Sequence, residues 1–299
     1  MIKEGETAFN IKLLVKGKNE NNEIIVGLGQ QKKVIKINGI NANCAADVAS
    51  IFNCATLTQE DMSLVSLGPE NRRSFLNQSQ FLTDPTWLEL AKKYKKNLDQ
   101  RNALLASQVA DPESLKIWTL QHWQITRQIQ LWRAQFIEKL KVKCNLLLKL
   151  HLPEMASEIT IKYKPEVDCT IDEFDNFFTQ AKSKLLSREQ IMARSLFGAH
   201  LDDFSVKIYG RCARSFASRG EQKLLTLLLK CAALQIVQDS GVGIGCLLID
   251  DFLTDLDKNR IEKCQQMIAD LNTQTIITMP GLRRDLFEKN SWTQELLFD

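Results

Sequence analysis

The chain of 299 residues is 44% hydrophobic and 25% charged, which is typical of globular proteins and excludes a disordered chain, a collagen-like repeat and a coiled-coil rod. The net charge of +3 by itself indicates no class of partner, but residues 86–150 hold 12 Lys and Arg against 5 Asp and Glu. No apolar stretch approaches the ~18 residues that a membrane span requires. The eight cysteines include no C-x-x-C pair and Met1 begins no secretion signal, so we expect a reduced, cytoplasmic protein without membrane contact.

Residues 7–37 predict an antiparallel β meander. Two apolar runs are separated by a polar turn, and a third run, KKVIKING, alternates apolar and polar residues before the turn signal Asn38-Gly39.

From residue 84 the apolar residues follow a helical period. We expect one helix to begin at Asp84-Pro85 and a second at Asp111-Pro112, because an N-cap Asp followed by Pro is typical of a helix start. The first reaches about Leu105 and the second about Leu150. Two capping boxes predict further helix starts at Thr170 and Ser187, and a strand is expected at residues 158–164.

After residue 200 strands and helices alternate, which predicts a mostly parallel sheet with helical cover. The expected strands are residues 204–209, 246–249 and 275–278, and the expected helices are residues 218–237 and 257–271.

The segment Ser218-Arg219-Gly220-Glu221-Gln222-Lys223 stands directly before a strongly apolar helix. A helix N-terminus presents unpaired N–H groups and partial positive charge, and Gly220 allows close approach of an anion such as a phosphate. The alternative is an ordinary capped helix.

Two carboxylates, Asp250 and Asp251, follow the apolar run at residues 246–249. The carboxyl ends of strands in open α/β sheets are where ligands bind. One carboxylate there can hold Mg²⁺ and its neighbour can orient an attacking water. The alternative is an N-cap for the next helix.

The order of these elements resembles the C-terminal half of an ABC-type ATPase head, in which a signature motif precedes a Walker B strand, a D-loop and a switch strand. Three further segments resemble the RecF family: residues 67–77 (LGPENRRSFLN), 98–105 (LDQRNALL) and 197–203 (FGAHLDD). Asn77, Ala199 and Leu201 depart from the family pattern. The chain is thus similar to this bacterial DNA replication and repair family, which is related to the Rad50 and SMC heads.

The resemblance implies an α/β fold, an ABC-type ATPase head with an inserted helical arm. Residues 1–66 would be the antiparallel β part of the head and residues 67–195 the mainly helical arm. Residues 196–299 would be the C-terminal half of the head, with the signature, Walker B, D-loop and switch elements.

The resemblance also implies residue roles. Asp250 would hold Mg²⁺ and Asp251 would act on the water. The signature residues that would contact the nucleotide of a partner head are Ser218, Gly220, Glu221, Gln222 and Lys223. The D-loop and switch positions are Thr254, Asp257 and Thr278. The candidates for DNA contact are Arg72, Arg73, Lys92, Lys93, Lys95, Lys96 and Arg101, with a solvated helical face or salt bridges as the alternative.

The implied function is ATP-dependent DNA binding in replication, recombinational repair and the SOS response. ATP and Mg²⁺ would join two copies around single-stranded or linear double-stranded DNA, with mediator proteins of the RecO and RecR type as partners. However, the 299 residues contain no G-x-x-x-x-G-K-[ST] loop, with which ABC ATPases cradle phosphates. We expect the chain to begin after the segment that carries this loop in the family, so that both cofactors require the loop to be supplied.

The alternative function is a truncated, non-hydrolysing module that binds DNA or partners without its own ATP site. A head of the SMC or RecN type is less favoured, because the arm is too short for a long coiled coil.

Overall fold

The computed structural model describes residues 5–16, 20–29, 32–107, 111–153, 159–170, 173–182, 184–251, 253 and 256–278. Thr254, a predicted D-loop residue, lies outside the described residues. None of the described helices is long and apolar enough to cross a membrane.

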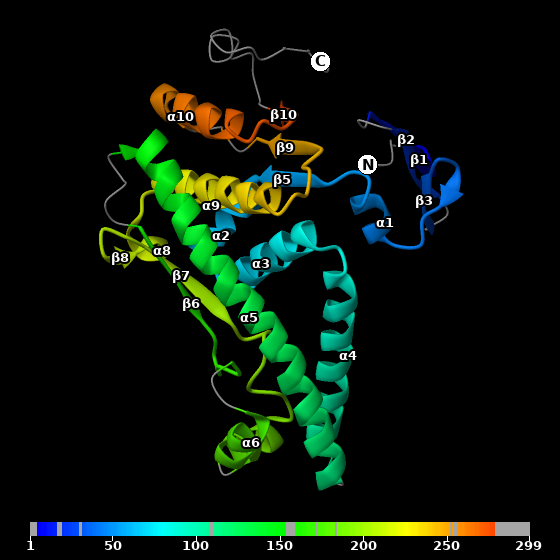
Figure 1. The fold of residues 1–299 in the computed structure, drawn as a ribbon, viewed down its shortest axis with the longest axis vertical. Helices are drawn as coiled ribbons and strands as arrows, with labels where there is room; N and C mark the ends of the chain where they lie inside the picture. The colour runs from blue at the N-terminus through cyan, green and yellow to red at the C-terminus, as the bar shows by residue number, and fades with distance from the viewer. Residues whose placement is uncertain are drawn as a thin grey trace.

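The N-terminal strands form the predicted antiparallel meander. β1 (Ala8–Lys16), β2 (Asn21–Gly29), β3 (Lys32–Ile37) and β4 (Ile40–Asn41) pair in chain order. The sheet lies at one side of the molecule, and α1 (Ala45–Ala49) follows it toward the head (Figure 1).

A parallel sheet forms the centre of the head. Within the described residues its strand order is β10 (Thr275–Thr278), β9 (Cys246–Asp250) and β5 (Cys54–Thr58). The register places Asp250 opposite both Thr58 and Thr278, so the carboxyl ends of the three strands meet. The predicted parallel sheet is confirmed for residues 246–249 and 275–278, although β5 was not anticipated. It is wrong for residues 204–209, which form β7 (Asp203–Ile208) of a separate antiparallel sheet.

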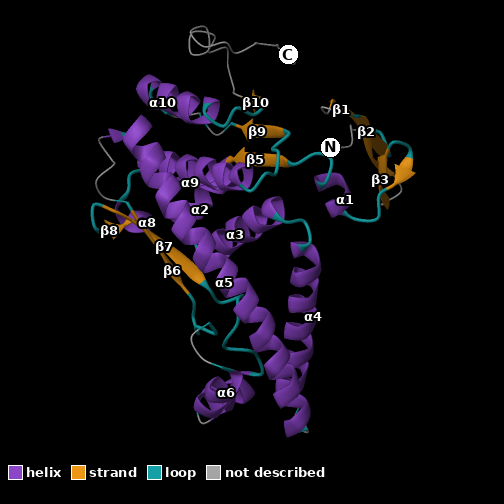
Figure 2. Cartoon of the chain, in the orientation of Figure 1, coloured by secondary structure: helices purple, strands orange, loops and turns teal. Residues whose placement is uncertain are grey.

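Helix α9 (Arg219–Asp239) covers this sheet and is buried along most of its length. Its leucines share one core cluster with Leu57, Leu247 and Ile249 of the sheet and with residues of α10 (Lys258–Ala269). Figure 2 shows the three strands between α9 and α10.

A second sheet, which is antiparallel, lies below α9. It contains β6 (Thr160–Lys164), β7 (Asp203–Ile208) and β8 (Arg211–Cys212), and the short helix α8 (Ala213–Phe216) connects it to α9. Three elements, η1 (Gln59–Met62), α2 (Ser63–Ser66) and α3 (Pro69–Thr83), lead from β5 to the arm. Phe75 and Leu76 of α3 belong to the same core cluster as α9.

The arm consists mainly of two long helices, α4 (Trp87–Ala106) and α5 (Pro112–His151), with α6 (Phe174–Lys182) and α7 (Leu185–Met192) near its far end. α5 has 40 residues and runs from the tip of the arm up to α9 (Figure 1). Asp111 caps α5 as predicted, because its side chain accepts hydrogen bonds from the N–H groups of Glu113 and Ser114.

The predicted helix start at Ser187 is wrong, because Ser187 lies inside α7 rather than at its N-cap. The start predicted at Asp84 is close to the observed one: α4 is assigned from Trp87, and the extended Asp84 accepts a side-chain hydrogen bond from the Thr86 N–H, as a capping residue does. α6 begins at Phe174, later than the start predicted at Thr170.

Candidate functional site

The carboxyl edge of the parallel sheet brings together Asp250, Asp251 and Thr278. The Thr278 hydroxyl, at the end of β10, donates a hydrogen bond of 2.5 Å to Asp250 Oδ1. The Asp251 N–H donates to both the hydroxyl and the carbonyl oxygen of Thr278, each at 3.2 Å. The predicted Walker B and switch positions therefore meet at this edge.

Gln59 joins this group, although the sequence pattern did not single it out. Gln59 directly follows β5, and its side-chain amide donates a hydrogen bond of 2.8 Å to Asp251 Oδ2. A polar residue directly after a predicted strand would have indicated Gln59. However, β5 (CATLT) is short and alternates Ala and Leu with Thr, so its sequence resembles a loop. We call Gln59, Asp250, Asp251 and Thr278 the carboxylate edge.

The carboxylate edge offers oxygen donors, which suit Mg²⁺. The described residues contain no group of three His, Cys, Asp or Glu side chains with the geometry of a metal site. Mg²⁺ in nucleotide sites keeps several waters and binds one or two carboxylates together with substrate phosphates. Asp250 fits that pattern, and Mg²⁺ held there would neutralise charge on a phosphate.

Ser218 is the N-cap of α9 and forms the predicted capping box. Its hydroxyl accepts a hydrogen bond of 3.3 Å from the Glu221 N–H, and the Glu221 carboxylate accepts one of 2.7 Å from the Ser218 N–H. Ser218 is exposed, so the start of α9 is accessible from outside. The guanidinium of Arg260 from α10 lies against Gly220, so a side chain at this position would require the end of the Arg260 side chain to move.

The rest of the signature segment turns inward. Gln222 donates to the Ala217 carbonyl at 3.1 Å and so closes the turn before α9. Lys223 is buried, with 9% of its surface exposed, although we expected it to face solvent or phosphate. That expectation is wrong because Lys223 lies on the face of α9 that packs into the core.

Asp257, a predicted D-loop residue, is the N-cap of α10. One carboxylate oxygen accepts a hydrogen bond from the Arg260 N–H, and the other lies 3.4 Å from Arg260 Nε. Asp257 thus fixes the arginine whose guanidinium contacts Gly220.

The arginines among the DNA-contact candidates lie mostly inside the protein. Arg101 is fully buried and holds Glu189 with hydrogen bonds of 3.0 and 2.6 Å, with the ring of Phe197 4.8 Å from its guanidinium carbon. Arg72 is buried against Asp203, which it contacts through Nε at 2.6 Å, and Arg73 donates to the Asp202 carbonyl. Arg72 and Arg101 therefore stabilise the fold, and we remove them from the candidates for DNA contact.

The four lysines Lys92, Lys93, Lys95 and Lys96 are all exposed on α4. Lys92 forms an exposed ion pair of 2.7 Å with Glu89, one turn earlier. These lysines remain available to a polyanion.

His200 belongs to a buried cluster at the junction of arm and head. Its Nδ1 lies 2.7 Å from the Tyr94 hydroxyl, and Tyr94 stacks on His122 with ring centroids 5.2 Å apart. Burial lowers the pKa of His122 to about 3 and that of His200 to about 4, and nearby arginines act in the same direction. Both histidines are therefore neutral at pH 7.

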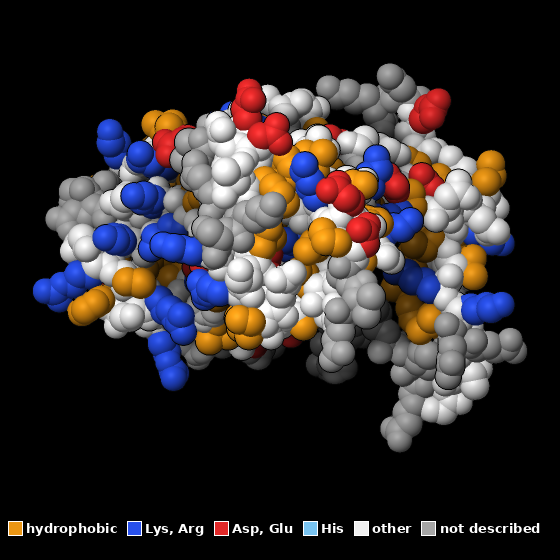
Figure 3. All heavy atoms as spheres, turned by 90° about the horizontal axis from the view of Figure 1, so that it is seen from below, with side chains coloured by type: hydrophobic (Ala, Val, Ile, Leu, Met, Phe, Trp, Pro, Cys, Tyr) orange, Lys and Arg blue, Asp and Glu red, His pale blue; other side chains and the backbone are white. Residues whose placement is uncertain are grey.

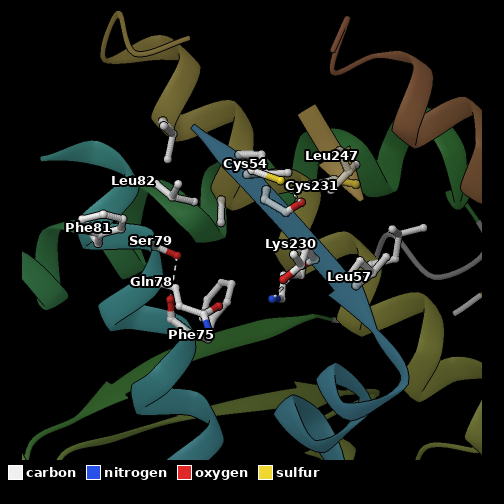
Figure 4. Close-up of a pocket in the computed structure, with 16 residues that line it drawn as sticks. Cys54, Leu57, Phe75, Gln78, Ser79, Phe81, Leu82, Lys230, Cys231 and Leu247 are labelled. Carbon is white, nitrogen blue, oxygen red and sulfur yellow. Dashed lines mark hydrogen bonds between the residues drawn. The ribbon is translucent and has the colours of Figure 1, made fainter. Parts of the chain in front are cut away.

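A small cavity of about 140 Å³ lies between β5, α3 and α9 (Figure 4). Its walls are apolar apart from Lys230, Gln78, Ser79 and Thr56, and the Lys230 ammonium is held by Asp61 at 2.8 Å. None of the predicted site residues lines it, so it is separate from the carboxylate edge.

The parallel sheet, the carboxylate edge and the capped start of α9 define an ABC-type ATPase head with an inserted helical arm. No family model matches the chain. The chain is 29% identical to the DNA replication and repair protein RecF of Agathobacter rectalis over 304 residues, which cover 100% of this chain and 80% of that protein. It is also 29% identical to RecF of Clostridium beijerinckii over 280 residues, 93% of this chain and 75% of that protein.

Solved structures confirm the fold. The recombination mediator protein RecF with ATP, in the RecFOR pathway, matches with a TM-score of 0.77 at 23% identity and covers 94% of this chain and 77% of that one. The same mediator as its ATPrS complex matches with a TM-score of 0.75 at 24% identity, over 92% of this chain and 76% of that chain. The resemblance to the RecF family that the motifs predicted is therefore confirmed over the length of the chain.

Proposed function

We propose that the chain is a RecF-like, ATP-dependent DNA-binding protein of replication, recombinational repair and the SOS response. The observation that carries this proposal is the carboxylate edge, where Asp250, Asp251 and Thr278 meet as nucleotide chemistry requires. The similarity to RecF proteins over the whole chain supports it. The division into head (1–66 and 196–299) and arm (67–195) is part of the proposal, as is a cytoplasmic location.

In this proposal Asp250 binds Mg²⁺ and Asp251 orients the attacking water. Gln59 fixes the Asp251 carboxylate through its hydrogen bond of 2.8 Å. Thr278 donates to Asp250 and so holds that carboxylate in one orientation. Where a G-x-x-x-x-G-K-[ST] loop is supplied, Asp250 would hold Mg²⁺, which would neutralise charge on the phosphates of ATP.

Ser218 serves the nucleotide of a second head. Its exposure at the start of α9 supports contact in trans, since its own hydroxyl is not joined to the carboxylate edge of the same chain. Asp257 supports this end of α9 through Arg260. Two copies would thus close on ATP.

DNA contact is proposed for α4, with Lys92, Lys93, Lys95 and Lys96 on DNA phosphates and Arg73 at the base of the arm. Proteins of the RecO and RecR type are the proposed protein partners, because the similar solved structures are of RecF in the RecFOR pathway.

A second function, a DNA- or partner-binding module without its own ATP site, is favoured by one observation. The 299 residues contain no G-x-x-x-x-G-K-[ST] loop. Equilibrium dialysis of residues 1–299 with ATP and Mg²⁺ separates the two functions. The module predicts no tight binding, whereas micromolar binding would show that these residues form a nucleotide site by themselves.

The DNA-binding part common to both is tested by fluorescence anisotropy with a labelled duplex of about 30 base pairs at low salt. Saturable binding is expected, because phosphate contacts dominate affinity under these conditions. Failure to bind duplex or single-stranded DNA at low salt would contradict the first function and leave for the second only the binding of protein partners.

A further inference from the structure

Lys230 in the middle of α9 is mostly buried, which is unusual for a lysine. Figure 3 shows Lys and Arg side chains standing out from the surface of the face that it draws, whereas only 13% of the Lys230 side chain is exposed. Lys230 lines the apolar cavity between β5, α3 and α9 (Figure 4). Its ammonium group lies 2.8 Å from Asp61 Oδ1 and 3.4 Å from the carbonyl oxygen of Thr56 in β5. Because a buried ion pair adds little net stability, stability alone does not explain why this pair is buried here.

Asp61 connects the ion pair to the turn that follows β5. Its second carboxylate oxygen, Oδ2, accepts a hydrogen bond of 2.8 Å from the Thr58 N–H, and the two residues form a capping box at the start of η1. One oxygen of Asp61 therefore contacts α9, and the other contacts the last residue of β5. A carboxylate held at both oxygens fixes residues 58–61 against α9.

Gln59 is the first residue of η1, and its side chain extends from this turn to the carboxylate edge. The amide donates to Asp251 Oδ2 at 2.8 Å and to the Asp251 carbonyl oxygen at 3.4 Å, across 192 residues of sequence. Gln59 is exposed, so no burial of apolar surface offsets the conformational freedom that the side chain loses in this contact. The contact therefore depends on a backbone that already places residue 59 next to Asp251.

We propose that Lys230 and Asp61 are positioning residues for Asp251. The ion pair fixes the turn after β5, and the turn places the Gln59 amide on the Asp251 carboxylate. This role rests on the proposed function only in the task of Asp251, which is to orient the attacking water. The alternative is that the register of the sheet, which pairs the last residue of β5 with Asp250, places Gln59 by itself, and that the ion pair only stabilises the fold.

Lys230→Met removes the charge and keeps a flexible apolar side chain of similar length against the cavity wall. The readout is the exchange of the Gln59 side-chain amide protons with water, measured by ¹⁵N–¹H NMR on residues 1–299 without nucleotide. The Gln59 signals are those that Gln59→Leu removes. We expect exchange to be roughly 3- to 10-fold faster in Lys230→Met, the range for loss of one hydrogen bond. Lys230→Arg keeps the charge, has room in the cavity of about 140 Å³, and should restore the original rate.

Lys143→Met is the matched control, because it removes a different ion pair of α9. Lys143 of α5 lies 2.7 Å from Asp239, at the C-terminal end of α9. Exchange of the Gln59 amide should be unchanged in this variant. Unchanged exchange in Lys230→Met, or equal acceleration in the two lysine variants, would overturn the proposal.

A double-mutant cycle tests the same link through the unfolding equilibrium in urea. If Lys230 acts through Gln59, the fold-changes that Lys230→Met and Gln59→Leu cause in the unfolding constant should not multiply in the double variant. The expected departure is a factor of about 2 or more, as for residues of one hydrogen-bond network. The fold-changes of Lys143→Met and Gln59→Leu should multiply. Simple multiplication in both combinations would contradict a link between Lys230 and Gln59.

Neither experiment uses ATP, so both are decided apart from the proposed function. Independent behaviour of Lys230 and Gln59 would overturn the positioning role and leave Asp250 and Asp251 as proposed. Absence of nucleotide-dependent association in a chain with a restored loop would contradict the proposed function, and the exchange rates would still decide whether Lys230 holds Gln59 on Asp251.

Discussion

Asp251 adopts a left-handed backbone conformation, with φ of 49°, directly after β9. Asn and Asp tolerate this region better than other non-glycine residues. The reversal separates the two neighbouring carboxylates, so that Asp250 contacts Thr278 while Asp251 contacts Gln59. One backbone angle thus allows two adjacent residues to serve different roles.

Asp251→Asn should therefore preserve the fold and remove only the carboxylate that is proposed to orient the attacking water. The free energy of unfolding in urea should stay within about 0.5 kcal/mol of the original, as is usual for an unstrained surface change. Asp251→Ala should lose about 1–2 kcal/mol, because Ala is strained at this angle. In a chain to which the G-x-x-x-x-G-K-[ST] loop is restored, ATP-dependent dimers of the Asn variant should form and persist in sedimentation experiments, and dissociation at the original rate would contradict the role of Asp251.

If Ser218 faces the nucleotide of a second head, as proposed, a bulky side chain there would occupy the space of the phosphate. Ser218→Arg should block nucleotide-dependent association with a head that carries a phosphate-binding loop, measured by sedimentation with and without ATP. Nucleotide binding by the partner head alone should not change. Ser240→Arg, at the exposed C-terminal end of the same helix, is the matched control and should associate normally. Equal association of both variants would show that Ser218 only caps α9.

At the scale of the helix, the lysines of α4 and its buried residues lie on different faces. Asn97, Arg101 and Leu105 face α5 and the interior at spacings of four, and the four lysines from Lys92 to Lys96 are exposed. Charge reversal of these four lysines to Glu should therefore weaken binding to all duplex sequences alike without affecting the core. The slope of log affinity against log salt should fall by about 0.9 for each lost phosphate contact.

The measurement is anisotropy of duplex DNA over a series of salt concentrations. Lys33→Glu/Lys36→Glu on β3 controls for the change in net charge. If the slope for the α4 variant equals that of the original chain, α4 is not a contact surface.

Periodicity predicted the long elements because their apolar faces are regular. α5 and α9 begin at their predicted caps, and β9 and β10 lie where short apolar runs indicated them. β5 was missed because its side chains alternate between small apolar residues and Thr, and with β5 the role of Gln59 was missed. Ser187 was misread because a capping-box pattern also occurs inside helices.

For Arg101 the residue type gave a wrong prediction, whereas the spacing along the helix would have given the right one. It was interpreted as a DNA contact because it is basic, yet Leu98, Arg101 and Leu105 lie three and four residues apart on one helix face. That spacing predicts burial. What the sequence does not show is the partner, since Glu189 lies 88 residues away and only the fold brings the two charges together.

At the scale of the whole molecule, the neutral histidines at the junction of arm and head should make stability depend on pH. His122 and His200 have pKa values lowered to about 3 and about 4, whereas an unfolded histidine titrates near 6.5. Between these values the unfolded chain binds more protons, so the free energy of unfolding falls as pH decreases below about 6.5. Between pH 7 and pH 5 each histidine should lower the free energy of unfolding by about 2 kcal/mol.

Urea denaturation of the original chain and of His200→Gln at both pH values tests this. The variant should lose less stability than the original over the same interval. Burial raises the pKa of Asp202, which acts in the opposite direction, but Asp202 is present in both chains and cancels in the comparison. Equal losses would show that His200 is not neutral in the folded protein.

The length of α5 gives the molecule a lever. A helix of 40 residues is roughly 60 Å long, and its inner end is fixed to the head through the ion pair Lys143–Asp239 and the hydrogen bond between His151 and Asp270, each of 2.7 Å. Tilting such a rod by one degree about the fixed end displaces the far end by about 1 Å. Because α4 packs along the outer part of this rod, a small rotation of α5 at the head would move the whole arm by a larger distance at its tip.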